Sequence, residues 1–277
     1  MNEWFEWRDA PPADFAVVGD PIAHSLSPRM HMAAYRALGL DLRYVALRVP
    51  SGEFYDAMDH LCTSGFRGVN VTIPLKGVAA NWANDAPIDL CEVDSLNTLR
   101  LKDRSGTNTD GLAMRDILDE ESQESTKNVS VLVLGTGGTA RAIMSSLGHA
   151  GYRVCAWART RKRLDAVLEH FTTPIEVRSS LDPAGCNYLI NATSASMNGQ
   201  SLPVIWCNAK SDLIAFDCYY TSGKTLFQTE AEAQGLRSFD GKKLLAYQGA
   251  RSFEWWTGMK APREAMLDAV YEDRASD

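Results

Sequence analysis

The sequence predicts an α/β protein of two domains, each with a largely parallel sheet covered by helices. Short apolar runs alternate with helical patterns along most of the chain, as expected where helices join parallel strands. A second series of this kind begins after the polar stretch at residues 119–128, which indicates a boundary or loop. The 277 residues also exceed the usual size of one compact domain, which by itself favours two domains or one large α/β unit.

The first series occupies the N-terminal third of the chain. Its expected strands span residues 15–19, 44–49, 69–73, 96–101 and 107–109. Its expected helices span residues 28–38, from 51 to about 65, and onward from Pro74. Pro74 is placed at a helix start because proline has no amide for a strand ladder but suits the first position of a helix.

The second series begins with a fully apolar strand at residues 131–134. Further strands are expected at 152–157, near 175, at 188–191 and at 213–217. Helices are expected from the glycine-rich stretch 135–140 to about 150, and at 162–170, 225–234, 244–256 and 262–270.

Composition excludes several classes of function. A formal charge of −7 argues against a nucleic-acid or anionic-membrane partner, because both require basic surface. No apolar stretch approaches the ~18 residues that span a bilayer, and the acidic, aromatic N-terminus is no signal peptide. The six cysteines are scattered without a Cys-x-x-Cys pair, which favours reduced core thiols in a cytoplasmic protein.

Lys76 is the first candidate catalytic residue. It lies in the first turn of the helix expected after strand 69–73, where the helix dipole disfavours a charged ammonium. Thr72 shares a face of that strand with Asn70. A solvated lysine is the alternative for Lys76, and a turn or edge amide is the alternative for Asn70, which is left outside the catalytic set.

A dinucleotide-binding loop is predicted at Gly135-Thr136-Gly137-Gly138-Thr139-Ala140. Gly-x-Gly-x-x-Ala between a buried strand and a helix is the Rossmann fingerprint, in which the glycines let a pyrophosphate approach the helix N-terminus. The next strand ends without an acidic residue and is followed by Ala158-Arg159-Thr160-Arg161-Lys162-Arg163. Cations there suit a 2′-phosphate, so NADP is favoured over NAD. A solvated basic helix start is the alternative.

These motifs together resemble the shikimate dehydrogenase family over about residues 15–262. The matching segments, in the family's order, are Gly19-x-Pro21-Ile22-x-His24-Ser25-x-Ser27-Pro28-x-x-His31, Asn70-Val71-Thr72-Ile73-Pro74-Leu75-Lys76, Leu96-Asn97-Thr98-Leu99, Asn108-Thr109-Asp110-Gly111, Gly135-Thr136-Gly137-Gly138, Asn191-Ala192-Thr193-Ser194, Asp217-Cys218-Tyr219-Tyr220 and the segment around Gln248.

The resemblance implies a substrate domain (1–112, completed by 242–277) and a Rossmann NADP-binding domain (113–241). It also implies NADP-linked, reversible reduction of 3-dehydroshikimate to shikimate, in the route to chorismate and the aromatic amino acids. Lys76 and Asp110 would then be the catalytic pair. The substrate-binding residues it implies are Ser25, Ser27, Thr72, Asn97, Tyr220 and Gln248, and Asp110 also holds the ring. The cofactor-binding residues it implies are Gly135, Gly137, Gly138, Thr139, Ala140, Arg159, Thr160, Arg163 and Thr193.

Three positions depart from the family pattern. Ala158 replaces an asparagine before Arg159-Thr160, Asp94-Ser95 replaces Gly-Ala before Leu96-Asn97, and Ser196 replaces a glycine after Asn191-Ala192-Thr193-Ser194. Asp94 would add negative charge near the site, so the departures bear on substrate range and cofactor contacts.

The residues themselves suit hydride transfer, because a reduced ketone needs a positioned proton donor. We expect Asp110 to orient the ammonium of Lys76, which donates the proton. Helix capping is an alternative for Asp110, Ser25 and Ser27. Without the family resemblance, the local sequence predicts that Gln248 is a surface amide. His24 and His31 lack further ligands at suitable spacing, so no metal is predicted.

Two other functions stay open. One is a paralogue that also takes quinate or an amino analogue, and the other is a nucleotide-sensing protein that has lost turnover. The presence of Lys76 and Asp110 favours the dehydrogenase. The predicted partner is a small-molecule substrate, with no nucleic acid and no membrane, and the chain is expected to be a monomer or a homodimer.

Overall fold

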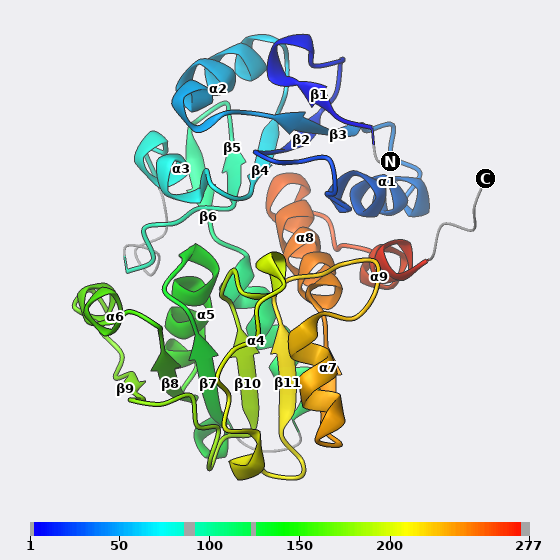
Figure 1. The fold of residues 1–277 in the computed structure, drawn as a ribbon. Helices are drawn as coiled ribbons and strands as arrows, with labels where there is room; N and C mark the ends of the chain where they lie inside the picture. Colours follow the sequence, from blue (N-terminus) through cyan, green and yellow to red (C-terminus); the bar gives the residue numbers. More distant parts are fainter. Residues whose placement is uncertain (1–2, 86–91, 123–125, 273–277) are drawn as a thin grey trace. The chain divides into compact units, whose positions relative to one another are not determined.

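The computed structural model describes residues 3–85, 92–122 and 126–272 (Figure 1). The chain forms two compact units, and each is described by itself. The first comprises residues 1–109 and 245–277, and the second comprises residues 110–244. The sequence had placed its boundaries at 112/113 and 241/242. The predicted α/β class with two parallel-sheet domains is confirmed.

The first unit is built on a six-stranded sheet of order β1-β3-β2-β4-β5-β6. Its strands are β1 (Phe5–Glu6), β2 (Phe15–Gly19), β3 (Tyr44–Arg48), β4 (Gly68–Val71), β5 (Thr98–Arg100) and β6 (Ser105–Thr107). β1, β3, β2 and β4 are parallel, while β5 and β6 are antiparallel to their neighbours. The carboxyl ends of β2 and β4 therefore lie side by side at one edge of the sheet.

Helices cover both faces of this sheet. They are α1 (Ser27–Ala37), α2 (Phe54–Thr63), α3 (Lys76–Trp82), α8 (Gly241–Thr257, which begins in the second unit) and α9 (Arg263–Tyr271). One face packs on α2 and α3 through a core that includes Val18, Leu47, Phe54, Met58 and Leu99. α1 packs on α9, and Phe15 of β2 stacks on Trp256 of α8. The apolar periodicity that predicted α1 and α2 is thus used for burial.

The second unit is a fully parallel six-stranded sheet of order β12-β11-β10-β7-β8-β9. Its strands are β7 (Ser130–Leu134), β8 (Arg153–Trp157), β9 (Glu176–Val177), β10 (Tyr188–Asn191), β11 (Ile214–Asp217) and β12 (Arg237–Phe239). Its helices are α4 (Asp110–Glu121), α5 (Gly138–His149), α6 (Arg161–Leu168) and α7 (Leu226–Ala233). The chain proceeds from β7 toward β9 on one side and returns through β10 on the other. The strand order therefore reverses between β7 and β10, which is where open α/β sheets bind ligands.

Several expectations about these elements were wrong. β6 spans Ser105–Thr107 and therefore lies two residues earlier than the strand expected at 107–109. α4 extends to Glu121, into the polar stretch 119–128 that indicated a boundary or loop. β1 and β12 were not predicted, because two or three residues carry no measurable periodicity. Of the cysteines, Cys155 and Cys186 are buried as expected, but Cys62 and Cys207 are exposed; Cys91 lies outside the described residues. No helix in the described ranges is long and apolar enough to cross a membrane.

Candidate functional site

Two loops of the first unit meet at the carboxyl ends of β2 and β4. Gly19, the last residue of β2, has no space for a side chain, because a Cβ there would collide with the methyl group of Thr72. The Asp20 amide donates to the carbonyl of Ile73 at 3.1 Å, and the Thr72 amide donates to Val18 at 3.0 Å. The loop that follows β2 therefore lies directly against the segment that carries Thr72.

Lys76 is the first residue of α3, with Leu75 at the N-cap. The strand before it ends at Val71, not Ile73, and the helix does not begin at Pro74. The reason is a turn closed by the Leu75 amide on the Thr72 carbonyl (2.9 Å), with Pro74 inside it after a cis peptide bond. The Lys76 carbonyl accepts from the Leu96 amide at 3.0 Å. This bond places the start of α3 beside Asn97.

Asn97, Thr109 and Gln248 form one buried polar cluster. Asn97 Oδ1 accepts from the Thr109 amide at 2.8 Å, and its Nδ2 donates to the Thr109 hydroxyl at 3.0 Å and to Gln248 Oε1 at 3.3 Å. Gln248 is only 9% exposed, so the unaided interpretation as a surface amide was wrong. α8 turns this side chain inward, and that packing has no signal in the local sequence.

Asn70 is a buried residue of β4 that hydrogen-bonds to the backbone of this cluster. It is 5% exposed and accepts a hydrogen bond from Tyr44 Oη at 2.7 Å. Its Nδ2 donates to the Asn97 carbonyl at 3.1 Å and to Ser252 Oγ at 2.9 Å. The alternative of a turn or edge amide is wrong, because β4 lies inside the sheet. Sequence reasoning also missed Tyr44, Thr109 and Ser252, whose role depends on contacts distant in sequence.

Ser25 and Ser27 are both buried in the loop and helix start that follow β2. α1 begins at Ser27 with Leu26 at the N-cap, so Ser27 is not the capping residue. The Ser27 amide instead donates to Ser25 Oγ at 3.3 Å, the kind of bond an N-cap side chain ordinarily makes. The capping alternative fails for Ser27, while Ser25 accepts from the first amide of the helix although it lies one residue before the N-cap.

Asp110 opens α4 in the second unit. It is buried, and its Oδ2 accepts from the Thr139 hydroxyl at 2.9 Å, so the structure joins it to the helix that follows the glycine-rich loop. Asp110 begins the helix itself, so it is a first-turn residue, where a carboxylate favours the helix dipole. Lys76 belongs to the first unit and Asp110 to the second, and their pairing stays a prediction.

The glycine-rich loop follows β7 at the point where the strand order reverses between β7 and β10. Gly135 follows β7 with φ at +114°, a conformation that favours glycine. A Cβ at Gly135 would lie 2.9 Å from the Ala192 carbonyl oxygen and 3.3 Å from Thr193 Cγ2. Gly137 is the N-cap of α5, Gly138 and Thr139 open the helix, and Ala140 is fully buried behind them. A helix start of this kind is a common binding place for an anion.

Thr193 follows β10 and lies against the turn at Gly135. Asn191 Oδ1 accepts from the Thr193 amide at 3.1 Å and from its hydroxyl at 2.7 Å. The Thr193 hydroxyl in turn accepts from the Ala195 amide at 3.2 Å. The end of β10 therefore fixes Thr193 against the turn at Gly135.

Comparison with known proteins identifies the family of this chain. The family model of the shikimate dehydrogenase substrate-binding domain matches residues 17–99, and that of the shikimate 5′-dehydrogenase C-terminal domain matches residues 244–271. The shikimate dehydrogenase (NADP(+)) of Methanococcoides burtonii is 35% identical over 93% of this chain and 97% of its own. The one from Thermococcus kodakarensis is 36% identical over 95% and 98%. The chain belongs to the shikimate dehydrogenase family.

A solved structure supports the same assignment. Shikimate 5-dehydrogenase from Thermus thermophilus, determined in complex with NADP(H) and shikimate, superposes with a TM-score of 0.83 at 33% identity, covering 92% of this chain and 97% of that one. The predicted family resemblance is therefore confirmed, and the two-domain fold of the family applies to this chain.

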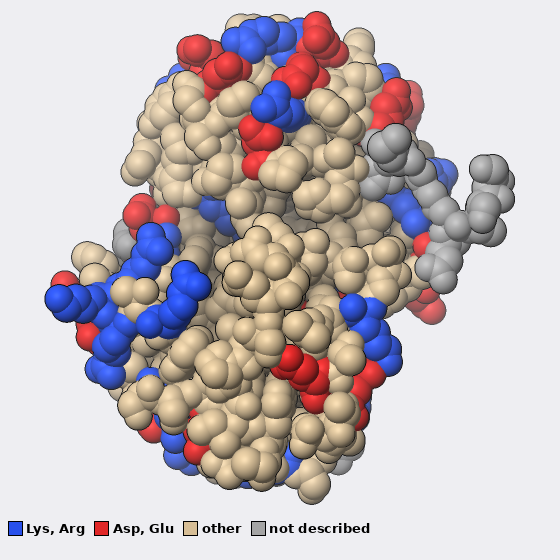
Figure 2. Space-filling model, in the orientation of Figure 1, with Lys and Arg blue, Asp and Glu red and all other residues tan. Residues whose placement is uncertain are grey.

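The basic residues expected to follow the second strand of the Rossmann unit lie at the start of α6. Arg159, Thr160 and Arg163 are all exposed, and Thr160 is the helix N-cap without a side-chain capping bond. Basic side chains gather over α6 in Figure 2. Arg161 pairs with Asp165 at 2.6 Å, whereas neither Arg159 nor Arg163 makes an ion pair within the described ranges. Their guanidinium groups are open to an anion from solution.

Tyr220 follows β11, and its ring stacks on that of Tyr219 with centroids 6.4 Å apart. Both rings are half-buried.

Among the departures from the family pattern, Asp94 is exposed with φ at +44°. Glycine is the residue that suits such a conformation, and aspartate is among the few others that tolerate it. The backbone conformation at this position is therefore one that glycine would adopt readily.

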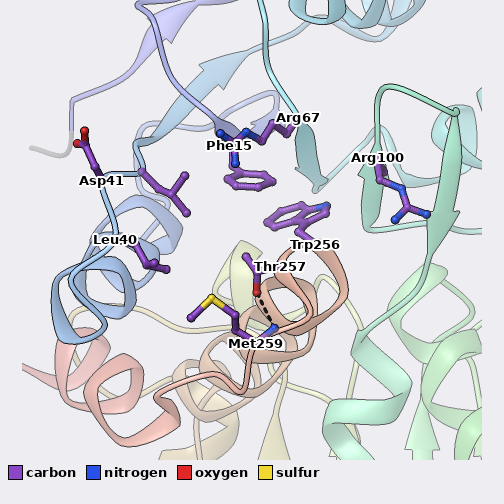
Figure 3. A pocket seen from close by; sticks show the side chains of 9 residues that line it. Phe15, Leu40, Asp41, Arg67, Arg100, Trp256, Thr257 and Met259 are labelled. Carbon is purple, nitrogen blue, oxygen red and sulfur yellow. Dashed lines mark hydrogen bonds between the residues drawn. The ribbon is translucent and has the colours of Figure 1, made fainter.

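A cavity of about 360 Å³ opens elsewhere on the first unit (Figure 3). Its walls include Phe15 at the start of β2 and Arg67 just before β4, so it lies at the opposite strand ends from Thr72 and Lys76. Arg67 is paired with Asp14 at 3.1 Å, and the other lining guanidinium, Arg100, with Asp103 at 3.0 Å. Both cations are thus already engaged, and this cavity is not the candidate active site.

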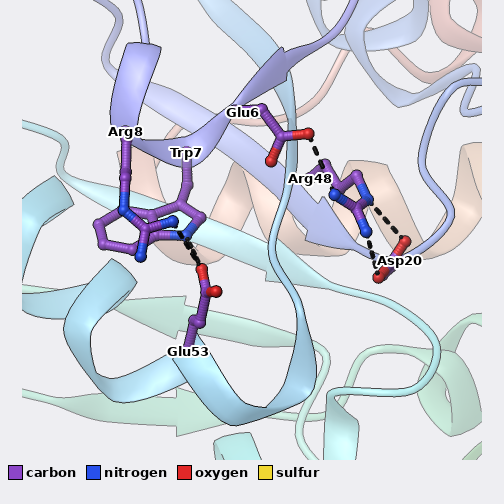
Figure 4. Close-up of polar contacts among 6 residues, drawn as sticks. All are labelled: Glu6, Trp7, Arg8, Asp20, Arg48 and Glu53. Carbon is purple, nitrogen blue, oxygen red and sulfur yellow. Dashed lines mark hydrogen bonds and ion pairs between the residues drawn. The ribbon is translucent and has the colours of Figure 1, made fainter.

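The N-terminal segment braces the loop that carries Ser25 (Figure 4). Trp7 is 6% exposed and donates from Nε1 to Glu53 at 2.7 Å. Next to it, Arg48 binds both carboxylate oxygens of Asp20, at 3.0 and 3.2 Å, and Glu6 at 3.1 Å. Asp20 begins the loop after β2, so the short strand β1 contributes to the position of that loop.

Proposed function

We propose that this protein is an NADP-dependent shikimate dehydrogenase that reversibly reduces 3-dehydroshikimate to shikimate, on the route to chorismate and the aromatic amino acids. The observation that carries the proposal is that one chain builds both required half-sites. A buried amide cluster, Asn97 with Gln248, lies beside Lys76 in one unit. A glycine turn facing Thr193 lies at the topological switch point of the other. Family members along the full length carry this activity in their names.

The first unit would hold the substrate. Ser25 and Ser27 would bind its carboxylate through their hydroxyl groups, at the start of α1. Thr72, Asn97 and Gln248 present hydroxyl and amide groups to the ring hydroxyls. Tyr220 of the second unit is assigned to the carboxylate. A buried amide that is already oriented by neighbours discriminates well, because a substrate lacking the matching hydroxyl leaves it unpaired.

Lys76 and Asp110 would carry the proton chemistry. Bound NADPH supplies the hydride that converts the ketone carbon to a secondary alcohol. The developing negative charge on the oxygen requires a proton, which the Lys76 ammonium donates, and Asp110 orients that ammonium. In the oxidative direction Lys76 accepts the same proton from the alcohol. The Thr139 hydroxyl fixes the Asp110 carboxylate for this task.

The second unit would hold the dinucleotide, and its residues fit that group. Gly135, Gly137, Gly138, Thr139 and Ala140 form a glycine turn that opens a helix, which suits a pyrophosphate. Thr193 lies against this turn. Arg159, Thr160 and Arg163 are exposed beside the end of β8 and suit a 2′-phosphate, so NADP is assigned over NAD. The roles of substrate domain and NADP domain follow for the two units.

The decisive experiment measures reduction of NADP+ with shikimate by the native protein and by Lys76→Ala. We expect turnover with NADP+ that falls by about a hundredfold or more in the variant, as for loss of a positioned acid–base group. Lys102→Ala, an exposed lysine of the same unit, is the matched control and keeps native turnover. Quinate and NAD+ are run in parallel.

Other outcomes would redirect the assignment. Faster turnover with quinate than with shikimate would indicate the paralogue of broader substrate range. Asp94 is the departure from the family pattern that would affect this range. Tight NADP+ binding with no turnover of either acid would leave a nucleotide sensor on this fold. Unchanged activity in Lys76→Ala would remove the lysine from the mechanism. We place the protein in the cytoplasm as the setting in which its scattered thiols stay reduced.

A further inference from the structure

Asp217 is a fully buried carboxylate at the end of β11. Its Oδ2 accepts from Ser196 Oγ at 2.5 Å and from Thr225 Oγ1 at 2.7 Å. Its Oδ1 accepts from the Tyr219 amide at 3.1 Å and from Asn191 Nδ2 at 3.2 Å. Burial raises the pKa of this carboxyl group, and the hydroxyl groups of Ser196 and Thr225 oppose that rise. We call these five residues the Asp217 network.

The network joins segments that are separate in the sequence. Asn191 ends β10, Ser196 lies in the loop after it, Tyr219 follows β11, and Thr225 caps α7. Asn191 Nδ2 also donates to Ser196 Oγ at 3.1 Å, so the serine hydroxyl is held from two sides. A buried carboxylate demands such partners, because an unpaired one is costly in the interior.

Ser196 is the residue through which the loop after β10 joins the network. Its hydroxyl group donates to Asp217 Oδ2 and accepts from Asn191 Nδ2, so this loop has a side-chain anchor on a buried carboxylate.

That loop packs on the glycine turn at the switch point. The Ala192 carbonyl oxygen lies so close to Gly135 that even a methyl group there would meet it at 2.9 Å. Asn191, which bonds Ser196 through Nδ2, holds Thr193 through Oδ1 at 2.7 Å. A displacement of the Ser196 anchor is therefore transmitted through Asn191 to the residues that face the glycine turn.

We propose that Ser196 and Asp217 are positioning residues that fix Ala192 and Thr193 against the glycine turn that binds the dinucleotide. The inference rests on the proposed NADP-binding function. Neither side chain needs to touch the cofactor. They act through Asn191, and their effect is on cofactor affinity more than on the rate of the chemical step.

The test compares four variants for NADPH binding, followed by the fluorescence of the dinucleotide without any substrate, and for thermal stability. Ser196→Ala removes the loop anchor, and Ser196→Thr retains the hydroxyl. Thr225→Val removes the other hydroxyl from the same Asp217 oxygen, but on the α7 side. Ser201→Ala removes a comparable serine–carboxylate bond to Glu230 (2.6 Å) on the exposed part of the same connection.

We expect Ser196→Ala to weaken NADPH binding by about tenfold, as for loss of a hydrogen bond to a charged group, and to raise the KM for NADP+ with kcat retained. Ser196→Thr should restore affinity to within about twofold of the native value, and Ser201→Ala should stay within the same margin. Thr225→Val should mainly lower the melting temperature, because it removes a helix cap.

The proposal is overturned if Ser196→Ala binds NADPH as tightly as the native protein. It is equally overturned if Thr225→Val or Ser201→Ala weakens binding as much, since the effect would then be general loosening. If the native protein itself binds no NADPH, the proposed function fails and this inference fails with it. Native binding with an unaffected Ser196→Ala rejects the inference alone.

Discussion

Asn97 holds both the backbone and the side chain of Thr109, because its Oδ1 accepts from the Thr109 amide at 2.8 Å and its Nδ2 donates to the Thr109 hydroxyl at 3.0 Å. Thr109 immediately precedes Asp110 in the chain. The residue expected to bind the substrate ring therefore also anchors the backbone next to the proposed acid–base pair. Asn97 thus links substrate recognition to the position of the catalytic segment, and the predictions below begin there.

Replacing Asn97 by alanine should lower the free energy of unfolding. The Thr109 amide and Gln248 Oε1 would lose a partner in a buried site, and an unsatisfied buried polar group costs about 1–3 kcal/mol. Urea denaturation measures this, and shikimate KM should rise in parallel. Asn84→Ala, an exposed asparagine of the same unit, is the control and should change stability by less than about 0.5 kcal/mol. Equal effects of the two variants would contradict the buried role of Asn97.

Replacing Asp110 by asparagine should reduce kcat while NADPH binding is retained. The amide preserves the size of the side chain and can still accept from Thr139, but it cannot orient an ammonium by charge. We expect kcat to fall by about a hundredfold. Asp116→Asn on the same helix is the matched control. Native turnover in Asp110→Asn would show that Lys76 works without this carboxylate.

Replacing Arg159 by alanine should weaken NADP+ selectively. Loss of one charge-assisted hydrogen bond to a 2′-phosphate should raise the KM for NADP+ by about tenfold, while the KM for NAD+, which lacks that phosphate, stays unchanged. Arg153→Ala is the control, because Arg153 is exposed at the opposite end of β8. Parallel rises for both cofactors would favour the solvated basic helix start.

The buried residue His31 should make the protein less stable in mild acid. Its ring stacks on Tyr44 with centroids 4.2 Å apart, and burial lowers its pKa from 6.5 to about 3. Between these values the unfolded chain binds a proton that the folded protein does not. The free energy of unfolding therefore falls as pH falls below 6.5, by up to about 1.4 kcal/mol per pH unit from this group.

Denaturation series at several pH values measure that slope. His31→Gln should reduce the slope of the unfolding free energy against pH. A change in stability that is equal at all pH values does not affect this slope. His24→Gln, at an exposed histidine, serves as the control and should keep the native slope. A native slope in His31→Gln would assign the acid sensitivity to other groups.

The parts of the site that lie within one short segment could be predicted from the sequence. The glycine turn at Gly135 requires a backbone conformation that favours glycine, and the strand and helix beside it are both encoded locally. The sequence likewise placed Lys76 at the start of a helix, although that helix begins at Lys76 and not, as expected, at Pro74. The Lys76–Asp110 pair and the substrate contacts came from the family resemblance, and remain predictions.

What the sequence could not show depends on packing between distant segments. Gln248 looks like a surface amide on its own helix and becomes buried only because α8 packs near Asn97 and Thr109. Asn70 looked like an edge residue because nothing local shows that β4 lies between β2 and β5. β1 has too few residues to show a period, and its position is fixed by pairing with β3 and by Trp7 on Glu53.

The distribution of the cysteines has a practical consequence for measuring motion between the two units. Cys62 is exposed in the first unit and Cys207 in the second, while Cys155 and Cys186 are buried. When Cys91 and Cys218 are changed to serine, the resulting variant carries one exposed thiol on each unit. A fluorescent donor and acceptor attached to these two thiols would report, by energy transfer in solution, whether adding NADP+ or shikimate brings the units together.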